Sequence, residues 1–160
     1  MDRALGRRVR DAATRVGFAE PLRLAGRALA PTFRGMLVIF ALRRRTRSAA
    51  AEAIAASLLA AGAAKILRDA IGRPRPGPRE EGGFPSRHAA AATAIAGSTA
   101  GRGIGVPFIG AAAATGLAGR IVSGEHDPAD IGAGVVLGMA ASALCAVAGR
   151  AIGAKRSPNR

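Results

Sequence analysis

Four long stretches of small and aliphatic residues, separated by polar loops, set the pattern of this chain. They cover residues 48–67, 88–101, 103–119 and 131–149. A helix rises ~1.5 Å per residue, so ~20 residues cross a hydrocarbon core of ~30 Å. The first and last stretches are long enough alone, whereas the middle two need neighbouring residues or a locally thin bilayer. The pattern predicts a membrane-embedded helical bundle. Because the stretches are rich in alanine, a soluble helical bundle is the alternative.

The region before these stretches is predicted to hold two further helices. Apolar residues recur at helical spacing among the arginines of residues 3–16. This is typical of a basic amphipathic helix lying on anionic lipid, although a solvated helix packed on the protein's own surface fits the same pattern. An apolar run at 36–42 ends at three arginines and finishes a second helix that begins after Pro31. We expect these first two helices to be short or interfacial.

Composition narrows the choice of protein class. The net charge is +14, yet 49% of the residues are hydrophobic, a combination that favours a membrane protein with basic flanks over a soluble nucleic-acid binder. Trp and Tyr are absent, so side chains for stacking on bases are scarce and we expect no nucleic-acid partner. The single cysteine, Cys145, cannot form an internal disulfide, and no Cys/His cluster offers a structural metal site. No secretory signal peptide is evident.

Charge and glycine spacing predict topology and packing. Residues 1–47 hold twelve Arg and three acids, and residues 150–160 hold four basic residues and no acid. The positive-inside rule then places both termini in the cytoplasm, with the loops 68–87 and 120–130 on the extracytoplasmic face. Two GxxxG pairs, Gly134 with Gly138 and Gly101 with Gly105, fit close helix packing in lipid.

The two histidines, His88 and His126, lie at the edges of apolar stretches. Asp130 follows His126 at i+4, and a carboxylate there can accept from imidazole Nδ1–H and leave Nε2 as a nucleophile. Asp127 and Pro128 are typical of an N-cap followed by proline at N1. The positive end of the following helix would then face an anion bound at this site.

The predicted helix start at Ser86 and the arginines of the two loops supply further groups that could bind an anion or transfer a proton. Ser86 is a plausible N-cap for the helix that carries His88, which could donate a proton to a leaving alkoxide. Arginine holds phosphate oxygens through a planar fork and keeps its charge. Singly, each arginine also fits a lipid-headgroup contact. Together with the histidines they predict a phosphoryl-transfer site. The loop arginines are Arg68, Arg73, Arg75, Arg87 and Arg120.

Three short motifs carry these residues in order along the chain. They read Arg68-x6-Arg75-Pro76, Pro85-Ser86-Arg87-His88 and Gly119-Arg120-x5-His126-x3-Asp130. The set resembles the type 2 phosphatidic acid phosphatase and vanadium haloperoxidase superfamily, whose motifs are K-x6-R-P, P-S-G-H and S-R-x5-H-x3-D. Arg68, Arg87 and Gly119 stand where that family has Lys, Gly and Ser.

The resemblance implies an all-α fold of six helices, the first two at about 3–16 and 22–42, with about four helices spanning the membrane. It implies that His126 attacks phosphorus, that Asp130 orients it, and that His88 protonates the leaving oxygen and then activates water. It also implies phosphate binding by Arg68, Arg75, Ser86, the backbone at Arg87, and Arg120, with no metal or other cofactor. Lys65, one turn before Arg68, is a possible substitute for it, and Gly119 lacks a hydroxyl that would help hold phosphate.

We therefore expect an integral cell-membrane phosphohydrolase that acts on a phosphatidate-like lipid or a polyprenyl phosphate or diphosphate through a phosphohistidine. Its expected partners are the lipid phosphate substrate and membrane lipids. The alternatives are a catalytically degenerate, basic membrane-binding protein and a vanadate-dependent haloperoxidase. The expected organisation is a basic N-terminal region at 1–47, a phosphatase core at 48–150 and a basic tail at 151–160.

Overall fold

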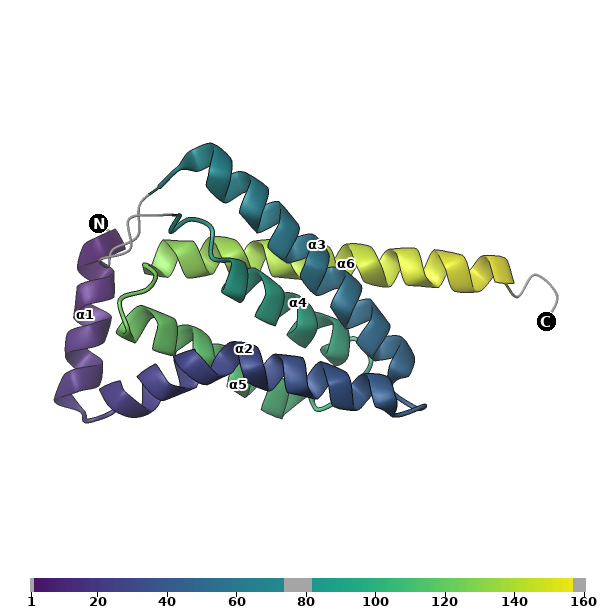
Figure 1. The fold of residues 1–160 in the computed structure, drawn as a ribbon, viewed down its shortest axis with the longest axis horizontal. Helices are drawn as coiled ribbons and strands as arrows, with labels where there is room; N and C mark the ends of the chain where they lie inside the picture. The colour runs from purple at the N-terminus through teal and green to yellow at the C-terminus, as the bar shows by residue number, and fades with distance from the viewer. Residues whose placement is uncertain (1, 74–81, 157–160) are drawn as a thin grey trace.

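The computed structural model describes residues 2–73 and 82–156, and this part of the chain consists of six α-helices without a strand (Figure 1). The fold class predicted from the sequence is confirmed. The helices are α1 (Asp2–Arg15), α2 (Ala19–Leu42), α3 (Arg47–Ile71), α4 (Arg87–Ala100), α5 (Val106–Val122) and α6 (Pro128–Arg156).

Turn and cap residues set the helix boundaries near the polar loops. α3 ends at Gly72, which has φ 63° and lets the chain turn away in the left-handed conformation. α4 begins after Ser86, whose side chain accepts a hydrogen bond from Ala89 N, so the predicted N-cap is confirmed. α6 begins at Pro128, as the sequence predicted from its fixed φ. These boundaries place both histidines beside helix N-termini.

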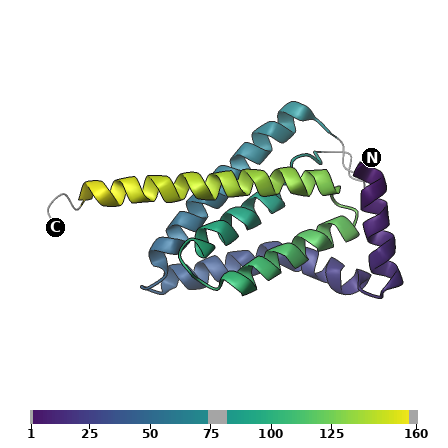
Figure 2. The same cartoon turned by 180° about the vertical axis from the view of Figure 1, so that it is seen from behind.

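α4 is the central helix and packs against α3 and α6 through small residues (Figures 1 and 2). A Cβ at Gly134 would lie 2.5 Å from Ser86 O, and one at Gly138 would lie 2.5 Å from Ala90 O. The predicted Gly134–Gly138 pair is therefore the point where α6 meets the backbone of α4. Gly101 and Gly105 instead flank the turn between α4 and α5, where Gly105 has φ 56°.

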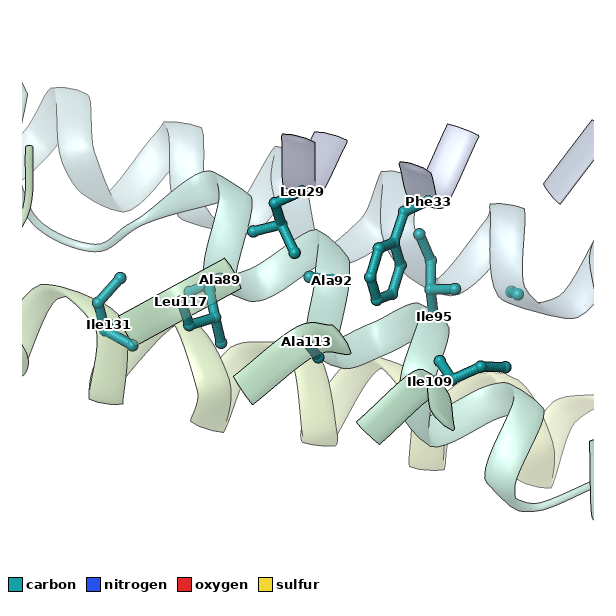
Figure 3. Packing of buried hydrophobic residues seen from close by; sticks show 10 residues of the cluster. Leu29, Phe33, Ala89, Ala92, Ile95, Ile109, Ala113, Leu117 and Ile131 are labelled. Atoms are coloured by element: carbon teal, nitrogen blue, oxygen red, sulfur yellow. The ribbon is translucent and has the colours of Figure 1, made fainter. Parts of the chain in front are cut away.

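A second crossing joins α2 to α5 and completes the apolar core. Leu29 and Phe33 of α2 point toward Ala92 and Ile95 of α4 (Figure 3). Ile109, Ala113 and Leu117 of α5 belong to the same buried cluster. The core is thus built from short side chains at close helix crossings, as the alanine and glycine content predicts.

Three helices are long and apolar enough to cross a membrane: Ala19–Leu42, Arg47–Ile71 and Pro128–Ile152. Large apolar side chains point outward on them, among them Val38, Leu58 and Leu144, as expected for a bilayer-facing surface. The expectation that the second helix is short or interfacial is wrong. Pro31 lies inside α2 without ending it, and the helix bends near its middle (Figure 1). α4 and α5 are the shorter helices of the bundle.

α1 lies across one end of the bundle, beside the starts of α2 and α6 (Figure 1). Gly6 and Ala13 are its buried residues, and Leu5 and Val16 remain exposed, so the helix packs on the protein and also presents an apolar face. We call the end with α1 and the loops 82–86 and 123–127 the site end, and the end with the turns 43–46 and 101–105 the far end. The last turns of α6 extend beyond the far end, whereas α1 lies at the site end (Figure 1). The expectation that both termini are cytoplasmic was based on four crossings that leave out α2, and it stays a prediction.

Candidate active site

His126 lies in the loop between α5 and α6, and 1% of its surface is exposed. The backbone N–H groups of Glu125 and His126 both donate to the carbonyl of Arg120, at 3.1 and 3.3 Å, which curls the loop tightly against the end of α5. His126 Nδ1 lies 3.1 Å from the carbonyl oxygen of Gly83, which can only accept, so Nδ1 carries the proton. Nε2 is left unprotonated and has no hydrogen-bond partner among the described residues.

Asp130 supports this loop from the first turn of α6. Its Oδ2 lies 3.5 Å from His126 Nδ1 and accepts a 2.9 Å hydrogen bond from the backbone N–H of Asp127. Its backbone carbonyl accepts from Ser86 N at 2.9 Å, which ties the start of α4 to the start of α6. Asp130 therefore positions both loops, while the nearer acceptor for the imidazole is Gly83, which the sequence analysis missed. A backbone carbonyl leaves no side-chain pattern to read.

The N-terminus of α6 is capped differently from the prediction. The Oδ1 atom of Asp127 has no hydrogen-bond partner among the described residues. Instead, Asp2 reaches over from α1, and its Oδ1 accepts from Ala129 N at 3.0 Å. Burial, together with the negative charges of Asp2 and Asp130, raises the pKa of Asp127. Asp127 is thus a buried carboxyl beside His126 rather than the cap.

Arg73 links α1 to these carboxylates, and it was named among the loop arginines but not assigned a site role. Its guanidinium bonds Asp2 at 2.7 Å and lies 3.6 Å from both Asp127 and Asp130. It also stacks over the ring of Phe84, with 5.8 Å from the guanidinium carbon to the ring centroid. The bond with Asp2 raises the pKa of Arg73, so it remains a cation that offsets the three carboxylates.

His88 lies in the first turn of α4, close enough to Arg120 and His126 for them to affect its pKa. Burial, followed by the positive charge of Arg120 and then the neighbouring imidazole of His126, lowers the pKa of His88 to about 4. Ser86, two residues earlier, is fully buried at the N-terminus of the same helix. The structure thus brings His88, His126 and Arg120 to one place at the site end, as the sequence predicted.

Arg120 is held at the end of α5, with its side chain 11% exposed. One of its terminal nitrogens forms an ion pair with Glu125, while its Nε has no hydrogen-bond partner among the described residues. Glu125 directly precedes His126 and was not predicted as a site residue. A cation with an unused Nε donor, in the same short loop region as the imidazole of His126, offers a place where an anion can bind.

The remaining predicted residues divide into three cases. The Arg68 side chain packs beside Gly82, where an added Cβ would lie 2.5 Å from Arg68 Cδ, so Arg68 borders the segment that holds His126. Lys65 is exposed and pairs with Asp69 at 2.6 Å, which favours Arg68 over Lys65 as the site residue. Arg87 is exposed beside His88, and Arg75 lies outside the described residues. The part of the chain that the structure describes contains no group of three or more metal-ligating side chains.

These features define an all-α bundle of six helices with two histidines and an arginine gathered at the helix ends. Neither a protein-family model nor a curated protein matches the chain. Among solved structures, the chain resembles the crystal structure of Aquifex aeolicus LpxE, with a TM-score of 0.71 and 21% sequence identity. The alignment covers 90% of this chain and 93% of that one. At this identity the similarity shows that the two chains share a fold.

Proposed function

We propose that the protein is a membrane phosphohydrolase that removes phosphate from a lipid through a phosphohistidine at His126. The observation that carries the proposal is the buried imidazole of His126. Gly83 fixes its Nδ1, and its Nε2 has no hydrogen-bond partner among the described residues. Arg120 and His126 both lie close enough to His88 to lower its pKa. The three motifs that resemble the type 2 phosphatidic acid phosphatases, and the three apolar helices, agree with the proposal.

In the proposed reaction, Nε2 attacks the phosphorus, a P–N bond forms and the bond between phosphorus and the lipid oxygen breaks. Where the leaving group is an alkoxide, His88 supplies its proton. Water, deprotonated by His88, then attacks the phosphohistidine and releases inorganic phosphate. Arg120, with Arg68 and the N-terminus of α4, would stabilise the charge on the phosphoryl oxygens.

The test is phosphate release from a panel of lipid phosphates by purified protein in detergent with EDTA present. We expect His126→Ala to lower the rate by at least about 1,000-fold, and His88→Ala to lower it by about 100-fold or more. Asp130→Asn keeps the size of the side chain, so this variant should fold. Its rate of phosphate release should be much lower because the carboxylate beside His126 is lost. Labelled phosphate should be trapped as an acid-labile adduct on the unmutated protein and not on His126→Ala.

Equal phosphate release by His126→Ala and the unmutated protein would overturn the proposed chemistry. Lipid binding that falls steeply with salt, without any phosphate release, would instead indicate a basic membrane-binding protein. The matched control is Lys65→Ala, which removes an exposed side chain that pairs with Asp69 and should retain activity.

A further inference from the structure

A cavity of about 360 Å³ lies between α2, α3 and α4, with His88 in its wall. The cavity follows α4 for two turns, from His88 to Ile95, or ~10 Å along the helix axis. Its walls are mainly apolar. Leu29 and Phe33 from α2, which point toward α4 in Figure 3, are among its lining residues. An apolar space of this size beside a polar site suits the part of a lipid next to its phosphate.

Two arginines also line this apolar cavity: Arg34 from α2 and Arg87 from the start of α4. Neither forms an ion pair with another described residue, whereas Arg68, Arg73 and Arg120 each contact a carboxylate. Arg34 precedes the end of α2 by eight residues, ~12 Å along the helix, inside a segment that could cross a membrane. A charge at such a position is costly in lipid and marks a path for a charged ligand.

We infer that Arg34, together with Arg87, binds a second anionic group of the substrate, and that the substrate class is a lipid diphosphate. The inference rests on the proposed function. With the terminal phosphorus at His126 Nε2, the leaving group lies on the His88 side and the lipid chain enters the cavity. The inner phosphate then lies between His88 and the chain, where the two unpaired arginines line the wall.

The chemistry of a diphosphate agrees with this arrangement. A bond forms between His126 Nε2 and the terminal phosphorus, the bond from that phosphorus to the bridging oxygen breaks, and the bridging oxygen leaves with the inner phosphate as a lipid monophosphate. A phosphate monoester has a second pKa of ~6, so it can depart without being protonated. The lowered pKa of His88 leaves its imidazole neutral at pH 7, which suits a leaving group that needs no proton. The arginines offset the charge that develops on the departing phosphate.

A lipid monophosphate with an uncharged backbone would leave Arg34, an exposed residue that lines the cavity, without an anionic partner. A diphosphate supplies that partner, and its two phosphates together match the separate cationic groups at Arg120 and at Arg34 with Arg87. The cavity therefore distinguishes substrates by the charge next to the scissile bond.

The experiment compares a polyprenyl diphosphate with the monophosphate of the same chain, using purified protein in detergent. The unmutated protein should have a kcat/KM at least about tenfold higher for the diphosphate. Arg34→Gln should lower kcat/KM for the diphosphate by about tenfold or more and change that for the monophosphate by less than about twofold. Arg34→Lys should recover part of the loss because the charge is kept.

The matched control is Arg27→Gln, the same change about two turns earlier on α2. Arg27 is exposed like Arg34 but does not line the cavity. It should leave both substrates unaffected. Equal effects of Arg34→Gln on the two substrates, no effect on either, or an unmutated protein without preference would each overturn the inference. The substrate preference of the unmutated protein needs no variant, so this test holds even if Arg34→Gln does not fold. Release of phosphate from neither lipid by the unmutated protein is a separate outcome, which overturns the proposed function.

Discussion

At the scale of single residues, the carboxylate of Glu125 forms an ion pair with a terminal nitrogen of Arg120, a donor that a bound phosphate would also need. A phosphate that binds Arg120 must compete with this carboxylate or displace it. We therefore expect Glu125 to weaken anion binding in the free protein. Its negative charge beside the site should also favour the release of phosphate.

Glu125→Gln should accordingly strengthen the binding of inorganic phosphate. We expect the inhibition constant for phosphate to fall by about five-fold, equivalent to ~1 kcal/mol for a partly exposed ion pair. Glu20→Gln is the control, since Glu20 forms an exposed pair with Arg23 on α2. Weaker phosphate inhibition in Glu125→Gln would show instead that Glu125 holds Arg120 in its binding position.

The sequence predicted candidate site residues from side chains at fixed spacings, such as His126 with Asp130 and Ser86 with His88. It could not identify the Gly83 carbonyl or Asp2, because each acts through a contact between segments distant in the chain. Arg73 was visible as a loop arginine, but its ion pairs with Asp127 and Asp130 depend on how two loops meet.

At the scale of helices, Gly119 is the point where α5 crosses α2. A Cβ at this position would lie 2.0 Å from Leu22 O and 2.6 Å from Gly26 N. The third motif of the resembling family has serine here, and the loss of that hydroxyl first suggested weaker phosphate binding. The structure gives another reason for glycine, since the backbone of α2 fills the space that a side chain would need.

Gly119→Ser should therefore destabilise the fold rather than improve binding. Overpacking against backbone costs ~1–3 kcal/mol, so we expect a melting temperature in detergent lower by about 2–12 °C. Gly110→Ser is the matched control on the same helix, because a Cβ there meets no atom within 4 Å. Unchanged stability with tighter phosphate binding would return position 119 to the phosphate site.

Hydropathy predicted α3 and α6 well because their apolar stretches are long and bear few charges. It underestimated α2, where Pro31 and Arg34 interrupt the apolar pattern that the helix nonetheless continues. Proline costs a helix one hydrogen bond, and packing of Leu29 and Phe33 into the core compensates on either side of it. Arg34, which interrupts the apolar pattern of α2, also lines the cavity between α2, α3 and α4.

At the scale of the whole molecule, the arrangement of the helices determines which groups share a membrane face. α1 and the candidate active site lie together at the site end, and the last turns of α6 lie beyond the far end (Figure 1). The described far-end segments 43–47, 101–105 and 150–156 hold eight Lys or Arg and no acid. The described site-end segments 2–18, 73, 82–86 and 123–127, counted without the helix ends that carry Arg68, Arg87 and Arg120, hold six Arg and four acids.

Two of the six site-end arginines, Arg3 and Arg73, lie beside the buried Asp127, which leaves fewer free cations on that face. The positive-inside rule then favours a cytoplasmic far end, with the active site and α1 outside. Cysteine labelling tests this in a Cys145→Ala background. A membrane-impermeant maleimide applied to intact cells should label Arg8→Cys on α1, and should label Arg44→Cys at the far end only after permeabilisation. The reverse pattern would put the active site in the cytoplasm, and labelling of both positions in intact cells would contradict a bundle that crosses the membrane.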